Sequence, residues 1–225
     1  EPIWETVAKS GLLAATYFWP GSDVSKGAWN CSLPYCHSYN SSVPYEERVD
    51  TVLQYFDIQD EEKRPSFITL YFEEPDHSGH LYGPDDPRID EAIAHVDHMM
   101  EKLLEGLETR GVLDDVSLIF LSDHGMVGTC DKKIIYLEDL SPWVQIKRQW
   151  ADSLSPIFAL RPTSSKDEDN DGDGDDKGYV NEVYKNITLA LSSGKVLNGE
   201  YLKVYLKDEL PARLHYCGSD RIAPI

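Results

Sequence analysis

Two short segments of the chain each place an aspartate close to a histidine. In "EEPDHSGH" the residues Asp76 and His80 stand four positions apart, and in "SDHGM" the residues Asp123 and His124 are adjacent. Each segment directly follows an apolar run. Carboxylate oxygens and neutral imidazole nitrogens together form a ligand set that zinc and related metals bind. These four side chains are therefore the candidate metal ligands of the sequence.

A simpler interpretation competes with the metal site, because an Asp and a His at a strand end often form a hydrogen-bonded pair that caps a turn. Pro75 and Gly79 predict that the first pair lies on a turn rather than in a helix, where Ser78 braces the ligands by hydrogen bonds. Ser122 and Gly125 flank the second pair. Either motif alone fits both interpretations. Because the same pairing occurs twice, we favour the metal site.

The number of candidate ligands points to an incomplete site. A catalytic zinc usually takes three protein ligands and keeps one position open, so four ligands are too few for two zinc ions and too many for one. Because the ligands form two pairs, we predict two metal ions, and this chain supplies only part of the ligand set of each. The chain has no G-x-S-x-G elbow and no cysteine in the surroundings of an activated thiol. We therefore assign no catalytic nucleophile within this segment.

The elements around the two pairs predict how they come together. Apolar runs at 66–72 and 116–122 have the composition of strands, and each ends where an Asp/His pair begins. Between them, 87–111 has the periodicity of a long helix. Strand, helix and strand in this order are typical of an α/β fold with a parallel sheet. Ligands bind beyond the carboxyl ends of such strands, so we expect the two pairs to lie side by side there.

Further elements follow from the same patterns. Strands are predicted at 11–21, 156–162 and 201–207, and helices at 44–56 and 179–191. The apolar stripe of the long helix is expected to comprise Ile89, Ile93, Val96, Met100, Leu103 and Leu107. Together these elements are enough for one large α/β domain or two small ones.

Composition excludes several classes of protein. Hydrophobic residues make up 41% of the 225, which supports a sizeable core, but no apolar run is long enough to span a membrane. The net charge of −19 argues against bulk nucleic acid as a partner. Part of this charge lies in the low-complexity segment 166–177, which holds seven acidic residues and which we expect to be a solvated surface loop. Its opening resembles a calcium-binding EF-hand loop, but Gly178 stands where the twelfth-position glutamate is required.

The sequence also indicates a compartment. Three N-glycosylation sequons begin at Asn30, Asn40 and Asn186. The four cysteines form an even set without C-x-x-C spacing. Cys31 and Cys36 are close enough in sequence to close a local loop, which leaves Cys130 and Cys217 for each other. Disulfides and sequons together favour a secreted glycoprotein, or one on the extracellular face of the secretory pathway.

Several motifs resemble those of a known family. "FWPGSD", "SVPYEERV", "FEEPDHSGHLYGP", "SDHGM" and "RLHYCGSDRIAPI" read in order like the catalytic domain of ectonucleotide pyrophosphatase/phosphodiesterases, within the alkaline-phosphatase-like superfamily. The resemblance covers most of the chain; the acidic segment and the region from Asn30 to Cys36 fit it least. It implies a mostly parallel central sheet with helices on both faces. It also implies that residues 1–225 are an internal part of one phosphodiesterase catalytic domain.

The resemblance implies how the two half-sites are completed. One Zn²⁺ would be held by Asp76, His80 and a later histidine, and the other by Asp123, His124, an earlier aspartate and a threonine nucleophile. The missing groups would lie before residue 1 and after residue 225, so other parts of the catalytic domain would be partners of this segment. The implied reaction is attack of the threonine on phosphorus, followed by hydrolytic release. We expect this segment alone to be inactive.

The resemblance also assigns a substrate pocket. Trp19, Pro20 and Tyr39 match positions that line the base pocket of the family, and Asp23 stands where it can contact a base. Aromatic stacking suits this role, since it holds any base without reading its edge. From the residues alone, Trp19 fits a pocket and a core equally well.

Three functions remain in competition. The favoured one is a two-zinc enzyme that cleaves nucleotide diesters or pyrophosphates. The second function is that of an enzyme with the same two metals that cleaves a lysophospholipid or a choline phosphodiester. Its substrate pocket would need a wider apolar lining. A third is a non-catalytic secreted domain with a degenerate metal site.

Overall fold

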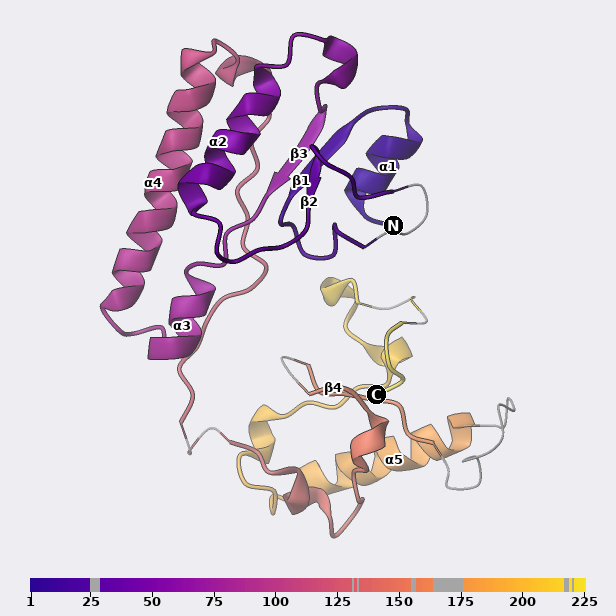
Figure 1. Cartoon of the computed structure of the whole chain (residues 1–225). Helices are drawn as coiled ribbons and strands as arrows, with labels where there is room; N and C mark the ends of the chain where they lie inside the picture. Colours follow the sequence, from indigo (N-terminus) through magenta and orange to yellow (C-terminus); the bar gives the residue numbers. More distant parts are fainter. Residues whose placement is uncertain are drawn as a thin grey trace. The chain divides into compact units, whose positions relative to one another are not determined.

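The chain folds into two compact units, which are described here separately. The computed structural model describes residues 1–24, 29–130, 132, 134–154, 157–163, 176–216, 219 and 221–225 (Figure 1). Unit 1 spans Glu1–Gly128 and unit 2 spans Thr129–Ile225. The interpretation of residues 1–225 as part of one catalytic domain stays a prediction.

Unit 1 contains a parallel sheet, as the sequence predicts. Its strands are β1 (Ala14–Tyr17), β2 (Cys36–His37) and β3 (Phe67–Leu70), in the spatial order β2-β1-β3. Both neighbours of β1 run parallel to it. All four residues of β1 are buried, which is expected of a central strand covered on both faces. The carboxyl ends of β1 and β3 therefore meet at one edge of the sheet.

Helices cover both faces of this sheet (Figure 1). On one side lies α1 (Ile3–Lys9), which the sequence analysis did not predict. On the other side lie α2 (Tyr45–Phe56) and α4 (Arg88–Thr109), close to their predicted ranges. A fourth helix, α3 (Asp76–Tyr82), precedes α4 and was also not predicted. The α/β class with a parallel sheet is confirmed.

The contact between α2 and α4 forms one of the cores of unit 1. Val49 and Leu53 of α2 pack against Met99 and Leu107 of α4, and all four are buried. The stripe predicted for α4 is confirmed at Ile89 and Leu107, which are buried, and at Leu103, which packs on the core, but it is wrong at Ile93, which is 49% exposed. The inward face is rotated so that Met99 takes a central position instead.

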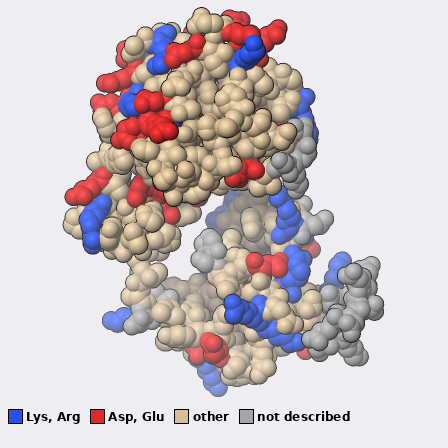
Figure 2. Space-filling view, viewed as in Figure 1, with Lys and Arg blue, Asp and Glu red and all other residues tan. Residues whose placement is uncertain are grey.

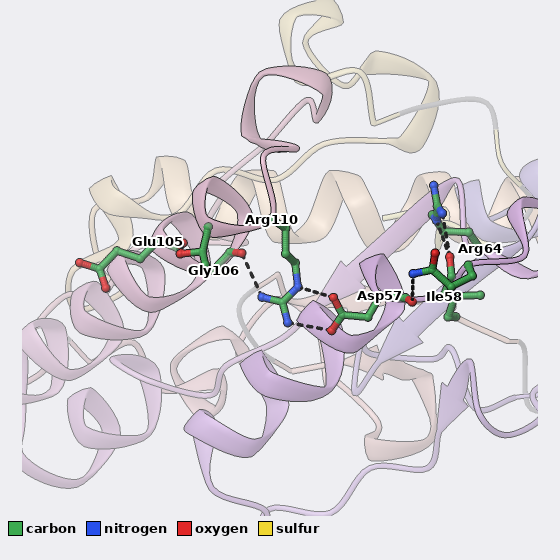
Figure 3. A network of polar contacts seen from close by, with 8 residues as sticks. Asp57, Ile58, Arg64, Glu105, Gly106 and Arg110 are labelled. Carbon is green, nitrogen blue, oxygen red and sulfur yellow. Dashed lines mark hydrogen bonds and ion pairs between the residues drawn. The ribbon is translucent and has the colours of Figure 1, made fainter.

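An ion pair at the ends of the same helices joins them a second time (Figure 3). Arg110 follows α4, and its Nε and Nη2 atoms donate to the two carboxylate oxygens of Asp57, each at 2.8 Å. Its Nη1 donates to the carbonyl oxygen of Gly106 at 3.0 Å. Hydrogen bonding to Arg110 holds the pKa of Asp57 below its usual value. Because Asp57 caps α2, this bidentate pair fixes one end of the helix pair.

Replacing Gly106 with Ala is expected to destabilise the protein by about 1–2 kcal/mol. A β-carbon at Gly106 would stand 2.7 Å from Leu53 Cδ2 and closer still to Cδ1, which is far inside van der Waals contact. Overpacking of this kind costs about 1–3 kcal/mol, and the higher helix propensity of Ala returns up to ~1 kcal/mol. Urea unfolding of the variant, with the exposed neighbour change Glu105→Ala as control, measures the difference. Unchanged or increased stability would mean that Leu53 rotates away freely.

The strand predicted at 116–122 is absent from the structure, and this prediction is wrong. The segment has no strand assignment and pairs with none of the described strands. Leu118 still packs against the core between α2 and α4, but Ile119, Phe120 and Leu121 are 82%, 51% and 66% exposed. A strand depends on hydrogen bonds to a neighbour, so an apolar β-rich composition cannot form one alone.

Unit 2 is built around one helix and a small antiparallel sheet. Strand β4 (Ala151–Ser153) pairs with β5 (Ala159–Leu160), and α5 (Asp176–Ser192) provides most of the remaining core. The predictions of a strand within 156–162 and of a helix at 179–191 are confirmed. The strand predicted at 201–207 is wrong, because no strand is assigned there and 3₁₀ turns occupy both of its ends.

Among the described residues, short 3₁₀ turns are found at Glu61–Lys63, Leu113–Asp115, Leu137–Leu140, Arg148–Trp150, Gly199–Tyr201, Lys207–Glu209 and Ala212–Leu214. Most of the acidic segment predicted to be a solvated loop lies outside the described residues. None of the described helices is long and apolar enough to cross a membrane.

The cysteines and the glycosylation sequons are the features on which the prediction of a secreted or extracellular glycoprotein rests. A disulfide joins Cys31 to Cys36, as predicted. Cys130 is exposed and bonded to no other described cysteine, and its predicted partner Cys217 lies outside the described residues. Asn30 and Asn40 are exposed in loops, whereas Asn186 is half-buried in α5. All three glycosylation sites stay predictions.

Charges of both signs are mixed on the surface of unit 1. On its visible face, Lys and Arg are interspersed with Asp and Glu rather than gathered into one patch (Figure 2). A nucleic-acid-binding surface usually carries a continuous basic stripe. The exclusion of bulk nucleic acid as a partner stays a prediction.

Candidate active site

The first Asp/His pair lies in a helix, so the predicted turn is wrong. Asp76 opens α3 and His80 follows one turn later, on the same helix face. Pro75 is tolerated because it precedes the first helical residue, where no amide hydrogen is needed. Gly79 is buried against Met126, since a β-carbon there would stand 3.0 Å from Met126 Cε. The helix holds His80 Nε2 at 3.4 Å from Asp76 Oδ1.

The second pair lies beside the first as expected, although the segment before it forms no strand. His124 Nε2 is 3.8 Å from Asp76 Oδ1 and 3.6 Å from Asp123 Oδ2. Asp76 Oδ1 is enclosed, although the side chain as a whole is 45% exposed, and this oxygen accepts no hydrogen bond from any described residue. A carboxylate oxygen in this position, between two imidazole nitrogens, is suited to a metal ion. The described residues nevertheless contain no group of three or more His, Cys, Asp or Glu in a complete metal-binding arrangement.

The orientation of His124 favours ligation through Nε2. Its Nδ1 lies 2.9 Å from the carbonyl oxygen of Gly125 and donates to it, so in the neutral imidazole the lone pair is on Nε2, which faces Asp76. The pKa of His124 is raised, first by this hydrogen bond and then by the negative charge of Asp123. Ser122 Oγ donates to the carbonyl oxygen of His124 at 2.6 Å and fixes the backbone. Backbone groups therefore hold this imidazole ready for a cation.

The start of α3 is braced by its neighbours. Ser78 is buried, and its amide nitrogen and Oγ donate to the Glu74 carboxylate at 3.0 and 2.9 Å. Ser78 was predicted to brace the ligands themselves, but these two hydrogen bonds go to Glu74 and not to Asp76 or His80. The Glu74 amide in turn donates to Tyr45 Oη of α2 at 3.1 Å. The position of Asp76 is set by both contacts.

A pocket of about 250 Å³ opens beside the carboxyl end of β1. It is lined by Phe18, Trp19, Pro20, Gly21, Ser22, Asp23, His37, Tyr39 and Tyr71. All four residues predicted to bind substrate are therefore brought together. Trp19 serves as both wall and core, because its partly buried ring also packs against the cluster around Trp4 and Trp29. Phe18 has φ = 60°, a strained conformation for a bulky residue, and such strain concentrates at functional sites.

Tyr71 connects this pocket with the Asp/His pairs. It lines the pocket, and its pKa is raised by burial and then by the carboxylates of Glu73, Asp123 and Asp76. Tyr71 directly follows β3 and precedes Asp76 by five residues, so a short segment of chain joins the pocket wall to the first Asp/His pair.

Some functional residues were missed from the sequence. Arg48 is completely buried in α2 and forms an ion pair with Glu73, and Tyr71 lines the pocket. Burial raises the pKa of Glu73, but hydrogen bonds from Arg48 and Tyr39 more than offset it, so the pKa is lowered. A signal for Arg48 was available: it precedes Val52 by four positions and so shares the apolar face of the helix.

The fold and the site together define a class of protein. A parallel α/β sheet with carboxylates and imidazoles beyond its strand ends, next to an aromatic pocket, is the arrangement of a ligand-binding α/β domain. The profile of the family described as "Type I phosphodiesterase / nucleotide pyrophosphatase" matches residues 1–225. The chain belongs to this family, and the resemblance noted in its motifs is confirmed.

Two curated relatives illustrate the similarity. Human ectonucleotide pyrophosphatase/phosphodiesterase family member 1 is 41% identical over 228 residues, which cover all of this chain and 22% of the human protein. Venom phosphodiesterase 2 of Crotalus adamanteus is 36% identical over 223 residues, which cover 99% of this chain and 25% of the venom protein. This chain therefore spans about a quarter of the length of these relatives.

Solved structures confirm the alkaline-phosphatase-like fold. Murine ectonucleotide pyrophosphatase/phosphodiesterase 5 matches with a TM-score of 0.69 and 31% identity, over 100% of this chain and 52% of the murine chain. A second structure of the murine protein is an inactive threonine-to-alanine variant in complex with AMP, with the same TM-score and identity.

Proposed function

We propose that this chain is part of a two-zinc hydrolase that cleaves phosphodiester or pyrophosphate bonds of nucleotides. The observation that carries this proposal is the enclosed Oδ1 of Asp76, which stands without a hydrogen bond between the Nε2 atoms of His80 and His124. A buried carboxylate oxygen without a hydrogen bond costs free energy. A cation held by carboxylate and imidazole ligands removes that cost, and this donor set is typical of zinc.

In this proposal the four ligands divide between two ions. Asp76 and His80 hold one zinc, and Asp123 and His124 hold the other; residues outside the chain complete both. When bound, the ions neutralise the phosphate and stabilise the charge that develops on its oxygens. The contribution of this chain is orientation: the Gly125 carbonyl fixes the tautomer of His124. A net charge of −19 makes such cations necessary for an anionic substrate.

We assign the nucleophile to a threonine outside these residues. The motif resemblance implies it, and the inactive variant of the murine relative is a replacement of threonine by alanine. An attacking group activated by the metal site explains why the segment needs no serine elbow or activated cysteine of its own. The catalytic role of this chain is then to hold ligands and substrate.

A nucleotide suits the pocket better than a lipid does. At about 250 Å³ the pocket is below the ~300–1,000 Å³ range of drug-sized ligand sites, which fits one planar ring system. Trp19 and Tyr39 supply stacking faces, Pro20 an apolar wall, and Asp23 a hydrogen-bond acceptor. AMP binds the murine relative. Tyr71 of the pocket wall precedes Asp76 by five residues, which supports a base pocket close to the proposed metals.

We further propose an extracellular setting. The Cys31–Cys36 disulfide and the exposed Asn30 and Asn40 fit a glycoprotein of the secretory pathway. One relative is named as a venom enzyme, and another carries the prefix "ecto" in its name. The other parts of the catalytic domain would be the partners that complete the site.

The experiment that tests the function is a metal analysis of the complete natural polypeptide that contains this chain. We expect about two zinc ions per molecule and hydrolysis of a nucleotide diester, lost with a chelator and restored by Zn²⁺. The 225 residues alone, which lack the proposed nucleophile, serve as an inactive control. A metal-free polypeptide that hydrolyses the diester at full rate would overturn the proposal. Absence of both metal and activity would favour a non-catalytic domain.

A further inference from the structure

The most deeply buried charge of unit 1 is Arg48, in the first turn of α2. Its side chain is 0% exposed. The guanidinium donates in a bidentate arrangement to Glu73, from Nη1 at 2.8 Å and from Nη2 at 3.1 Å. Burial of a cation is costly unless its donors are satisfied, and a bidentate carboxylate is the best partner for an arginine. Such a costly group calls for a role beyond filling space.

The remaining donors of Arg48 reach two backbone segments at the edge of the site. Nε donates to the carbonyl oxygen of Val43 at 3.1 Å, at the end of the loop that carries Tyr39. Nη1 also donates to the carbonyl oxygen of Tyr71 at 3.0 Å, where β3 leads into the metal-ligand loop. One side chain thus holds the backbone on both sides of the pocket.

Two aromatic rings pack on the same guanidinium. Its Cζ lies 5.0 Å from the centroid of Phe18 and 4.6 Å from that of Tyr45, both within cation–π range. Phe18 lines the pocket in its strained conformation. Tyr45 accepts the hydrogen bond from the Glu74 amide. The first ring belongs to the pocket wall, and the second supports the segment that leads to Asp76.

A continuous path of contacts therefore runs from the pocket to the first metal pair. Glu73, held by Arg48, precedes Asp76 by three residues. Glu74, held by Tyr45, binds Ser78 in the first turn of α3. Because Arg48 contacts both the pocket wall and the metal-ligand loop, a shift of the guanidinium would change the distance between them. Misplacement by about 1 Å is enough to cost ~100-fold in rate.

We propose that Arg48 is a positioning residue that holds the base pocket and the metal-ligand loop at one fixed separation, and thereby sets the preference for nucleotide diesters over smaller ones. This inference rests on the proposed function. A nucleotide must reach the pocket and the metal site at once, so it depends on their separation. A small diester needs the metal site alone and is insensitive to that separation.

The test is Arg48→Lys in the complete natural polypeptide. Lysine keeps the positive charge but lacks the planar guanidinium group, so it cannot donate to Glu73, Val43 and Tyr71 at the same time. Steady-state rates are measured with p-nitrophenyl thymidine 5′-phosphate and with bis(p-nitrophenyl) phosphate. We expect kcat to fall for both, and KM to rise about tenfold for the nucleotide alone. The ratio of the two kcat/KM values then falls about tenfold.

The matched control is Arg110→Lys. It removes another bidentate arginine–carboxylate pair, with Asp57, which joins the ends of α2 and α4 outside the site. We expect its selectivity ratio to equal that of the wild type. If Arg48→Lys fails to fold, Glu73→Gln takes its place, because it keeps the shape and weakens the same pair; a severalfold loss of the ratio is expected.

The outcomes separate the two proposals. A merely structural role would lower kcat equally for both substrates and leave both KM values unchanged, which would overturn the positioning role of Arg48. Binding of AMP, measured by calorimetry, gives a readout without turnover: wild type binds and Arg48→Lys binds about tenfold more weakly. A wild-type polypeptide that neither cleaves the nucleotide diester nor binds AMP would instead refute the proposed function, and this inference with it.

Discussion

Asp76→Asn in the complete natural polypeptide is expected to reduce hydrolysis of a nucleotide diester by at least about 1,000-fold. That loss corresponds to about 4 kcal/mol of transition-state stabilisation. Asp76 is the group on which both imidazoles converge, at 3.4 Å for His80 and 3.8 Å for His124. An amide keeps the shape of the side chain but removes the negative charge that balances a cation. Both half-sites would therefore be weakened by one substitution.

Rates should be compared with zinc content in the same preparations. We expect the variant to lose bound zinc in parallel with activity, and to keep its far-ultraviolet circular dichroism spectrum. Asp97→Asn, on the exposed face of α4, is the matched control and should behave as the wild type. A variant with full zinc content and nearly full activity would show that Asp76 is only a capping residue, as the simpler interpretation has it.

Trp19→Ala is expected to raise KM for a nucleotide diester by about 10- to 100-fold. Stacking of one base on an aromatic ring contributes about 1–3 kcal/mol, and Trp19 offers the largest ring of the pocket. The rate with bis(p-nitrophenyl) phosphate, which has no base, should change little. We therefore expect the substitution to weaken substrate binding and to leave the chemical step largely unchanged.

Trp19→Phe is the matched variant, because it keeps a stacking face and should recover most of the affinity. The packing of Trp19 against the cluster around Trp4 and Trp29 makes a loss of stability a competing explanation. Unfolding by urea measures that loss separately. If both substrates were affected equally, Trp19 would be a core residue with no part in base recognition.

The helices and the parallel sheet of unit 1 were largely predictable because their signals are local or repeated. In α2, the apolar spacing of Val49, Val52 and Leu53 gave the correct helix, and all three are buried. The missed α3 is short, and its Pro75 and Gly79 read as turn residues in isolation. Pro75 proved to lie before the first turn, and Gly79 to be required by Met126. The latter contact joins residues remote in sequence, so no local pattern contains it.

The strand predicted at 116–122 failed for a different reason. A helix satisfies its backbone within itself, whereas a strand needs a hydrogen-bonded neighbour. The composition of this run is that of a strand, but no described strand lies against it, and Ile119 to Leu121 are exposed. The composition of the segment therefore shows only that it is able to form a strand. Whether it does so depends on a neighbouring strand to pair with.

By itself, the sequence determined the chemistry of this protein: which carboxylates and imidazoles are available, that they follow apolar runs, and which family's motifs they match. Only the tertiary structure decided how those groups meet. It placed His124 against Asp76, gathered Trp19 and Tyr39 into one pocket, and buried Arg48 between that pocket and the loop before α3. The physical reason is that residue types are fixed by the chain, whereas distances between remote side chains are fixed by the packing of helices on the sheet.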